Sequence, residues 1–402
     1  MQNKLLRPPA IVLSLFDTGL GAIRSLGREG VPVIGMDSDL SKPGFKSRYC
    51  KAMLCPDPVR QSRELLEFML ELGRTFEHPG ILFPASDAFV LFVSRNRDKL
   101  CSYFRFNLPS ETIMETIANK RLQYELARTV NTHCPDTWYP QTIEEVGSIK
   151  NMIDYPAFIK PYYSHLWREV FPTKKGIKVH SPQELLTAFE EILPTGLQVM
   201  VQSLIIGPNT NHYKVNVYMD SRGVPLAHFT LRKIRQFPVE FGIGSLVESI
   251  HDNELLECGL RFFREIGYRG IGSIEFKKDE RDGRLKMIEL NPRLWQQNYL
   301  ATVCGINFPL VQYLDLTGQA PQPVSEFPDK VKWFDEFADF KSYWEYSRRK
   351  ELSFFRWLLS MKGVKAHATF AVDDMGPFLS KNGYGMKYLR LPLYIFKRSR
   401  MT

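Results

Sequence analysis

Apolar and polar positions along the first hundred residues change repeatedly between two patterns. Short apolar runs predict strands over 11–16, 31–36 and 81–84, and helical spacing predicts helices over 22–29, 60–73 and 87–97. Strands that alternate with helices in this way are typical of a parallel sheet. We therefore expect an α/β domain with a parallel sheet over residues 1–112.

Two glycines follow the first apolar run. Residues 17–21 read as a turn that precedes the first helix, and they contain Gly19 and Gly21. Two interpretations remain open. The glycines could let backbone N–H groups bind an anion at the helix start, or they could only permit a tight turn. The third glycine of a dinucleotide-binding fingerprint is absent, because Arg24 stands at its position.

The next ninety residues have a mixed pattern. Apolar positions over 112–130 predict one helix with Asn119 and Lys120 near its middle. Further along we expect strands over 155–160, 177–180 and 199–206 and helices over 143–152 and 182–193. Ser181 is the expected N-cap of the second of these helices. The segment 113–205 is predicted to form a small α+β lid.

Hairpins dominate the segment 206–320. One hairpin is expected where runs over 215–219 and 226–233 flank a polar turn, and another where 273–276 and 285–290 flank Arg281-Asp282-Gly283-Arg284. Helices are predicted over 253–266, 295–303 and 308–316. We expect a central antiparallel sheet here, with a boundary at Pro321-Gln322-Pro323.

The second hairpin carries the candidate chemistry. If its turn centres on Asp282, Glu275 and Glu289 lie opposite each other, with Cβ atoms about 5 Å apart. Facing carboxylates repel unless a cation lies between them. Asn291 projects from the same strand face and adds an oxygen ligand suited to Mg²⁺ with nucleotide phosphates. Arg293 follows on that face and could hold a carboxylate or phosphate. The alternative is a solvated hairpin with two unrelated surface glutamates.

Composition narrows the choice of partners. The net charge of +9 favours anionic ligands, and no zinc-finger spacing, RNA-stacking motif or long basic block indicates nucleic-acid binding. Six scattered cysteines form no metal-binding pattern, which fits a reducing cytoplasm. We expect neither a signal peptide nor a membrane span, because no run reaches about 18 apolar residues.

At this point the chain resembles the ATP-grasp superfamily, and within it the carboxylate–amine ligases. The resemblance runs from about residue 10 to 318, and its most specific part is Glu289-Leu290-Asn291-Pro292-Arg293 with Glu275 one strand earlier. It implies that Glu275, Glu289 and Asn291 bind Mg²⁺, with Mn²⁺ as an alternative ion. It also implies that Arg293 faces the acyl phosphate or tetrahedral intermediate.

The resemblance extends to the nucleotide. It implies that Lys120 and Lys160 are the two lysines that contact ATP, and that the backbone of the segment Gln202-Ser203-Leu204 reads adenine. Ser203 and Asn209 stand where the family often has acidic residues. The segment 162–168 has no glycine where a glycine-rich phosphate loop is usual, and Ser164, His165, Lys174 and Lys175 could supply side-chain contacts instead.

One more strand is a candidate for the site. Alternation places Arg232 on one face of the run 231–236, and Lys233 and Arg235 on the other. One of these faces could meet the triphosphate or an acidic substrate, and Arg232 is our candidate for a second catalytic arginine. The alternative is a solvated edge strand.

The segment 321–402 differs in composition from the rest. Aromatic residues stand among basic clusters at 347–350 and 396–400. We expect residues 324–402 to lie outside the catalytic core and to touch an anionic membrane or glycan at the periphery. The alternative is that the aromatics pack on the main body.

The resemblance thus implies a cytoplasmic, ADP-forming ligase whose reaction has two steps. ATP phosphorylates a small carboxylate, an amine or thiol displaces phosphate, and no covalent enzyme intermediate is needed. The first alternative is an ATP-binding module with weak turnover, and the second is a membrane- or glycan-associated scaffold. The sequence does not identify the substrates or the oligomeric state.

Overall fold

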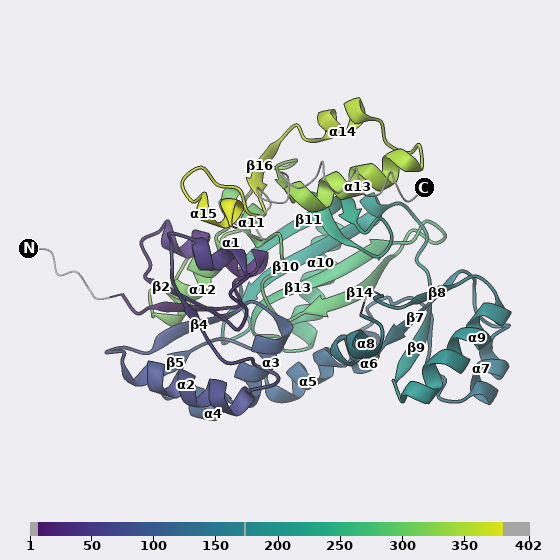
Figure 1. Ribbon diagram of the computed structural model, residues 1–402, viewed down its shortest axis with the longest axis horizontal. Coiled ribbons are helices and arrows are strands. Elements are labelled where there is room, and N and C mark those ends of the chain that lie inside the picture. The colour runs from purple at the N-terminus through teal and green to yellow at the C-terminus, as the bar shows by residue number, and fades with distance from the viewer. Residues whose placement is uncertain (1–6, 173, 381–402) are drawn as a thin grey trace, which may run out of the picture.

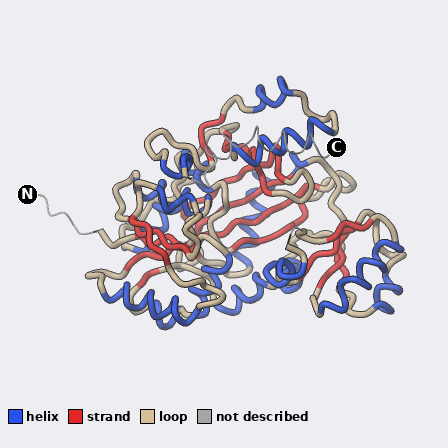
Figure 2. Tube along the Cα trace, in the orientation of Figure 1, coloured by secondary structure: helices blue, strands red, loops and turns tan. Residues whose placement is uncertain are grey.

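The computed structural model describes residues 7–172 and 174–380. Within them the named strands form sheets of five, seven and four strands, and these sheets follow one another across the molecule (Figure 1, Figure 2). None of the described helices is long and apolar enough to cross a bilayer.

The N-terminal sheet is parallel, as predicted, with strand order β3-β2-β1-β4-β5. Its strands are β1 Ala10–Leu13, β2 Val33–Asp37, β3 Lys51–Leu54, β4 Gly80–Pro84 and β5 Phe104–Arg105. The helices of this domain are α1 Asp17–Gly27, α2 Ser62–Arg74, α3 Asp87–Arg95 and α4 Arg97–Leu100, with a 3-10 turn η1 Pro43–Lys46. The central strand β1 is buried throughout, which explains its continuous apolar run.

The start of α1 differs from the prediction. The helix begins at Asp17 and therefore includes the segment that we expected to be a turn. A Cβ atom on Gly19 would lie 1.8 Å from the backbone oxygen of Ser14, and one on Gly21 would lie 2.7 Å from Asn298. These glycines therefore allow the helix to pack closely against its neighbours.

The predicted helix over 112–130 is two helices, α5 Glu111–Ala118 and α6 Lys120–Thr129. Asn119 separates them, because its backbone is extended and its side chain caps α6 by accepting hydrogen bonds from the N–H groups of Arg121 and Leu122. Lys120 is therefore the first residue of a helix and does not lie in the middle of one.

The four-stranded lid sheet has the order β6-β9-β7-β8 and is antiparallel. Its elements are β6 Thr137–Trp138, α7 Ile143–Ile149, β7 Ala157–Pro161, α8 Ser164–Val170, β8 Ile177–Val179, α9 Pro182–Ile192, the 3-10 turn η2 Leu193–Thr195 and β9 Val199–Ser203. Ser181 caps α9 by accepting from the N–H group of Glu184, as predicted. The helices α7 and α9 pack on one face of this sheet.

The seven-stranded central sheet has the order β14-β13-β10-β11-β12-β15-β16 and is antiparallel except between β15 and β16. Its strands are β10 His212–Met219, β11 Pro225–Phe237, β12 Ile243–Ser249, β13 Gly270–Lys278, β14 Leu285–Asn291, β15 Lys332–Phe334 and β16 Val364–His367. The 3-10 turn η3 Asn209–Asn211 precedes β10.

Helices cover both faces of the central sheet. The helix α10 Asn253–Glu265 packs on one face, where it meets Val215, Val217 and Ile274. The helices α11 Asn298–Val303 and α12 Phe308–Leu316 pack together with α1 on the other face. Toward the lid, the sheet carries polar side chains that include Lys214, Lys233 and Glu275.

The C-terminal segment belongs to the central sheet in its described part. The strand β15 pairs with β12, and Trp333 on β15 is buried. The helix α13 Glu336–Arg348 is held by a buried ion pair from Arg235 to Asp339, and α14 Phe354–Ser360 and α15 Gly376–Leu379 follow. The expectation that this segment lies outside the core is therefore wrong for residues 324–380. The basic cluster at 396–400 lies outside the described residues.

Candidate functional site

The hairpin of β13 and β14 has the predicted register from Glu275 away from the turn, but a β-bulge between Glu275 and Phe276 shifts the pairing next to the turn. Glu275 pairs with Glu289, and Ser273 pairs with Asn291. The turn is fixed by Asp279, whose buried carboxylate accepts hydrogen bonds from Arg281 and Lys286. Because facing residues project to the same side of an antiparallel pair, Glu275, Glu289 and Asn291 share one face of the sheet.

Two lysines from neighbouring strands hold Glu275. Lys214 of β10 lies opposite Glu275 in the register, and its Nζ is 2.8 Å from Oε1. Lys233 of β11 places its Nζ 3.2 Å from Oε2. All three side chains are largely buried. Both oxygens of Glu275 are therefore paired within the sheet.

Glu289 has different surroundings, because β14 is the edge strand of the sheet. Its carboxylate forms an ion pair with Lys120 at the start of α6. Its side chain is 36% exposed, compared with 14% for Glu275. Lys160 at the end of β7 approaches from the lid, and its Nζ donates to the hydroxyl of Tyr124 at 2.9 Å and to Gln202 at 3.4 Å.

Arg293 joins the hairpin to the N-terminal domain. Its guanidinium forms two hydrogen bonds with Asp87, at 2.6 Å and 3.1 Å. Asp87 is the first residue of α3, and Ser86 caps that helix. A third guanidinium hydrogen bond, at 3.3 Å, reaches the side-chain oxygen of Asn291. The predicted site residues Glu275, Glu289, Asn291 and Arg293 are thus brought together.

The electrostatic balance keeps both glutamates ionised. Burial alone would raise the pKa of Glu275, but Lys214 and Lys233 outweigh burial and hold that pKa well below its usual value. For Glu289, burial is outweighed by Lys120, so this pKa is also lowered. Burial lowers the pKa of Lys160 and of Lys214 against the opposing effect of the glutamates.

A divalent cation at this site would need oxygen donors that are free to turn toward it. No group of three His, Cys, Asp or Glu side chains suited to a metal occurs in the part of the chain that the structure describes. Mg²⁺ commonly uses only one or two carboxylates and completes its shell with water and substrate phosphates. The open carboxylate of Glu289 and the amide oxygen of Asn291 fit that pattern, whereas Glu275 would first have to release a lysine.

The predicted adenine-reading segment links the lid to the central sheet. Gln202 and Ser203 are buried at the end of β9, and the side chain of Gln202 contacts both Lys160 and Thr137. The carbonyl of Leu204 accepts a hydrogen bond from Arg281 at 3.0 Å. Asn209 donates to the carbonyl of Val239 and to the hydroxyl of Tyr346 on α13, so its side chain is directed toward the C-terminal segment.

Arg232 is not brought to this cluster. It pairs in register with Tyr213 and Glu248, which lie on the face opposite Glu275, and its guanidinium binds Glu248 at 2.6 Å. The strand β11 is internal, so the interpretation as a solvated edge strand is also wrong. A β-bulge after Lys233 turns Arg235 toward Asp339. Lys233 alone of these three basic residues reaches the glutamates.

The segment after Lys160 is helical where we expected a loop. The helix α8 contains Trp167, which is buried and donates to the carbonyl of Lys174 at 2.8 Å. Lys175 donates to the carbonyl of Phe241, and the ring of Phe241 stacks on Phe158 with centroids 4.3 Å apart. The loop before β12 therefore lies against the lid. The side chains of residues 164 and 165 lie outside what the structure describes.

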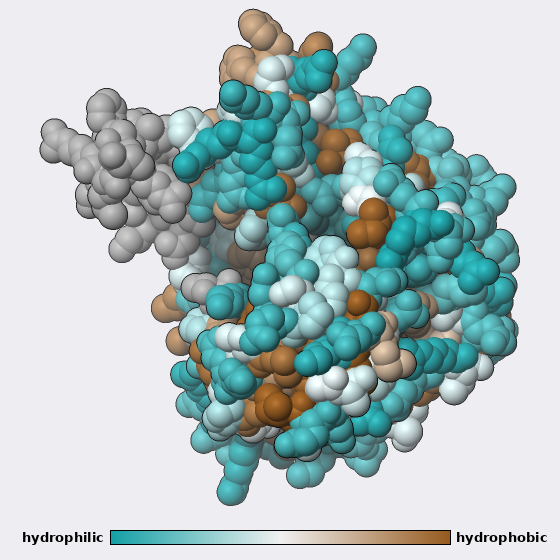
Figure 3. All heavy atoms as spheres, turned by 90° about the vertical axis from the view of Figure 1, so that its right-hand side faces the viewer, coloured by the Kyte–Doolittle hydropathy of each residue, from teal (hydrophilic) through white to brown (hydrophobic). Residues whose placement is uncertain are grey.

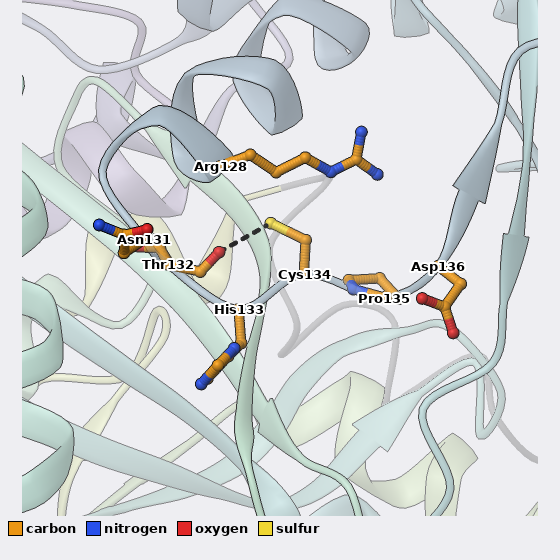
Figure 4. A pocket seen from close by; sticks show the side chains of 7 residues that line it. All are labelled: Arg128, Asn131, Thr132, His133, Cys134, Pro135 and Asp136. Atoms are coloured by element: carbon orange, nitrogen blue, oxygen red, sulfur yellow. Dashed lines mark hydrogen bonds between the residues drawn. The ribbon is translucent and has the colours of Figure 1, made fainter.

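A cavity of about 280 Å³ lies along the segment between α6 and β6, which leads into the lid (Figure 4). It is lined by Arg128, Asn131, Thr132, His133, Cys134, Pro135 and Asp136. None of the predicted site residues lines it. Burial raises the pKa of the Cys134 thiol to about 12, which removes the thiolate as a nucleophile at neutral pH.

Two residues of the cluster were missed in the sequence. Lys214 stands directly before the apolar run of β10, in alternation with Asn216, and a lysine at an inward position of a strand is a signal that could have been used. Asp87 carried no such signal, because an aspartate in the first helical turn is common at capped helices. Its contact with Arg293 joins positions 206 residues apart.

Known proteins share parts of this sequence. Residues 239–313 match the family model of the carbamoyl-phosphate synthase L chain, ATP binding domain. The D-aspartate ligase of Enterococcus faecium is 26% identical over 296 residues, which is 67% of each chain. The carbamoyl phosphate synthase large chain of Myxococcus xanthus is 22% identical over 307 residues, but this chain spans only 26% of that protein.

Solved structures share the arrangement of the three sheets. The N5-carboxyaminoimidazole synthetase of Staphylococcus aureus, complexed with ADP, superimposes with a TM-score of 0.62 at 13% identity and covers 80% of this chain and 81% of its own. The L-amino acid ligase of Bacillus licheniformis gives a TM-score of 0.60 at 15% identity, covering 81% and 78%. The chain has the ATP-grasp fold. The predicted ATP-grasp fold, with its parallel N-terminal sheet, lid and central antiparallel sheet, is confirmed.

Proposed function

We propose that this ATP-grasp chain is an ADP-forming ligase that activates a carboxylate with ATP and joins it to an amine. The observation that carries the proposal is the arrangement around Glu289. The open carboxylate of Glu289 forms an ion pair with Lys120 of α6 and lies beside Lys160 of the lid. Arg293, four residues further along, donates two hydrogen bonds to Asp87. The ligases among the similar proteins support the same reading.

The charge of the cluster favours a polyphosphate. The cluster has five cationic side chains and three carboxylates, so it carries two positive charges in excess. The cations are Lys120, Lys160, Lys214, Lys233 and Arg293, and the carboxylates are Glu275, Glu289 and Asp87. The magnesium complex of ATP is a dianion, so it would neutralise this excess. We place its phosphates between Lys120 and Lys160, and its adenine at the segment Gln202-Ser203-Leu204.

We propose that Glu289 and Asn291 hold the divalent cation, and that Glu275 contributes an oxygen only when a lysine moves away. Bound there, Mg²⁺ would screen the charge that develops on the transferred phosphate, and Mn²⁺ has compatible ligand preferences. Lys214 and Lys233 could then approach the phosphates as point charges, because in the described part of the chain Glu275 is the ion-pair partner of each.

The chemistry needs positioning and charge stabilisation rather than an enzyme nucleophile. A substrate carboxylate oxygen attacks the γ-phosphorus of ATP, and the bond from that phosphorus to the β,γ-bridging oxygen breaks. ADP departs, and the substrate becomes an acyl phosphate. The amine nitrogen attacks the acyl carbon, phosphate departs, and the amine loses a proton. Arg293 can hold the oxyanion of the tetrahedral intermediate with its planar fork, and Asp87 keeps that fork oriented.

We further propose that the carboxylate substrate is an amino acid. The D-aspartate ligase and the L-amino acid ligase both act on amino acids by their names, and each resembles more than two thirds of this chain or of its fold. The six free cysteines are compatible with a cytoplasmic enzyme, which is where we place it.

One observation favours a second candidate function. The helix α8 stands where a loop of close-approaching backbone was expected, and its buried Trp167 fixes it. Side chains on a helix cannot wrap a phosphate as closely as a glycine-rich backbone can. The chain would then bind ATP and turn over slowly, as a nucleotide-dependent module.

Steady-state ADP formation separates the two candidates. The protein is incubated with Mg²⁺-ATP and pooled D- and L-amino acids, with and without pooled amines, and ADP is measured. The ligase predicts ADP release that requires a carboxylate and rises with an amine. ATP binding by calorimetry without carboxylate-dependent ADP would establish the binding module instead.

A further inference from the structure

The helix α14 forms an exposed apolar ridge at the edge of the molecule. Phe355 and Leu359 are 77% and 73% exposed, and Phe354 and Leu358 are each more than 40% exposed. Phe355, Leu358 and Leu359 have the i, i+3, i+4 spacing that places side chains on one face of a helix. In Figure 1 this helix projects beyond the central sheet, and hydrophobic side chains stand at the same height in Figure 3.

The opposite side of α14 is anchored firmly, so the exposed ridge is not a frayed segment. The ring of Trp357 stacks on Tyr343 of α13 with centroids 4.8 Å apart, and its indole N–H donates to Asp339. The hydroxyl of Ser360 accepts from Arg235 of the central sheet at 2.6 Å. These contacts use the tryptophan and the serine and leave Phe355 and Leu359 pointing away.

The surroundings of the ridge are basic. Between residues 344 and 365 the structure has six exposed cationic side chains and one exposed carboxylate; the cations are Arg348, Arg349, Lys350, Arg356, Lys362 and Lys365, and the carboxylate is Glu351. A protein partner could bind the apolar side chains without contacting the basic ones, so the basic side chains distinguish between the possible partners. Aromatic and aliphatic side chains ringed by lysine and arginine are the combination that inserts into an anionic lipid surface.

We propose that α14 and its basic rim, residues 348–362, dock the protein on an anionic lipid bilayer. Phe355, Leu358 and Leu359 enter the boundary between headgroups and acyl chains, and the cations contact the phosphates around them. In Figure 1, α14 lies at the top of the molecule and the lid at the lower right, and the rim meets the lid at Glu240, which forms ion pairs with both Arg349 and Lys178 of β8. The inference does not depend on ligase activity.

Vesicle co-sedimentation of the full-length chain tests the proposal. Vesicles of phosphatidylcholine with about 40% phosphatidylglycerol are compared with pure phosphatidylcholine, at low and high salt. We expect binding at least about ten-fold tighter to the anionic vesicles, and weaker at high salt because counterions screen the cationic rim. Each basic residue at such a surface is worth about five-fold in partitioning, so Arg356→Glu with Lys362→Glu should lower binding by ten-fold or more.

The apolar ridge has its own variant and controls. Phe355→Ser with Leu359→Ser should lower binding to anionic vesicles by about ten-fold while the Mg²⁺-ATP thermal shift stays as in the wild type. Val59→Ser with Met152→Ser, at positions each 68% exposed elsewhere, and Arg74→Glu with Lys99→Glu should bind like the wild type. Wild-type protein that stays in the supernatant at low salt would overturn the proposal. So would a ridge variant that binds normally, or control variants that lose as much binding as the α14 variants.

Discussion

Glu275 and Glu289 are the same residue type, on the same sheet face and directly opposite each other, yet they lie in two different regions. Glu275 is on an internal strand, where β10 and β11 supply Lys214 and Lys233 to its two oxygens. Glu289 is on the edge strand, where no further strand can supply a partner and its contact comes from the lid-side helix α6.

The difference indicates how one hairpin can serve both structure and ligand binding. The internal carboxylate balances two buried ammonium groups, so its removal would leave charge uncompensated inside the sheet. The edge carboxylate is more than twice as exposed and has one mobile partner, so it can exchange that partner for a cation. We therefore expect the two glutamates to respond differently to substitution.

The largest expected effect is that of changing Glu289, the exposed glutamate on the edge strand. Glu289→Gln should lower ligation by at least about 10³-fold and remove most of the thermal stabilisation by Mg²⁺-ATP, because the main cation ligand loses its charge. The melting temperature without nucleotide should change little. Differential scanning fluorimetry with and without Mg²⁺-ATP, beside turnover assays, measures both. Equal nucleotide-induced shifts in variant and wild type would remove Glu289 from the metal site.

Arg293→Lys should come next, with ligation reduced by about 10² to 10³-fold. A lysine cannot reproduce the two hydrogen bonds to Asp87 or hold two oxygens of an intermediate at once. Calorimetric ATP affinity should remain within a few-fold of the wild type. Near-normal turnover would show that Arg293 only joins the domains, and Asp87→Asn serves as the variant that perturbs the same junction from the other side.

For Glu275, the buried glutamate on the internal strand, the expected effect of substitution is on stability. Glu275→Gln should lower the free energy of unfolding by about 3 kcal/mol at neutral pH, because Lys214 and Lys233 lose their carboxylate. The folded-state pKa of Glu275 lies below its unfolded value, so the ion pairs stabilise the protein above the unfolded-state pKa and are lost as the pH falls through the folded-state pKa.

Urea denaturation at several pH values therefore measures both the size and the pH dependence of the contribution that Glu275 makes to stability. The difference between wild type and Glu275→Gln should be largest near pH 7 and should shrink as the pH falls below about 4. Adding Lys214→Met to Glu275→Gln should recover part of the lost stability, because one unpaired ammonium is removed. If the difference in unfolding free energy did not change with pH, the loss of stability would come from altered packing and not from the lost ion pairs.

The smallest expected effect concerns the lid. Lys160→Ala should weaken nucleotide binding by about ten-fold while the stability of the free protein is nearly unchanged, because burial already lowers the pKa of this lysine and its partners are neutral. Lys150→Ala, on the surface of the same lid, is the matched control. Unchanged nucleotide affinity in Lys160→Ala would argue against phosphate binding between the lid and Glu289.

The sequence predicted the parts of the site that depend on local spacing. Glu289, Asn291 and Arg293 follow from alternation within one strand, whereas Glu275 faces Glu289 because of a β-bulge between Glu275 and Phe276 that the turn length does not predict. Lys214 and Asp87 depend on strand order and on the packing of distant helices, which local spacing does not contain. The same limit explains Arg232, since alternation separates two faces of a strand but does not say which face meets the cleft.

The fold shows a similar division. Periodicity located ten of the sixteen named strands and most helices up to residue 316, but it missed the short or edge strands β3, β5, β6, β12, β15 and β16. It also merged α5 and α6, because the apolar spacing continues across Asn119 while the backbone does not. It also placed residues 324–380 outside the core, since aromatic and basic composition is the same for a sheet edge and for a surface. Pairing of β15 with β12 decided that question.

Trapping of the activated carboxylate tests the central claim most directly. The protein is incubated with Mg²⁺-ATP, a responsive amino acid and hydroxylamine in place of the amine, and hydroxamate and ADP are measured together. The account predicts equal amounts of hydroxamate and ADP in the wild type and neither in Glu289→Gln. ADP formation without hydroxamate, or hydroxamate formation that persists in Glu289→Gln, would contradict acyl-phosphate chemistry at this site.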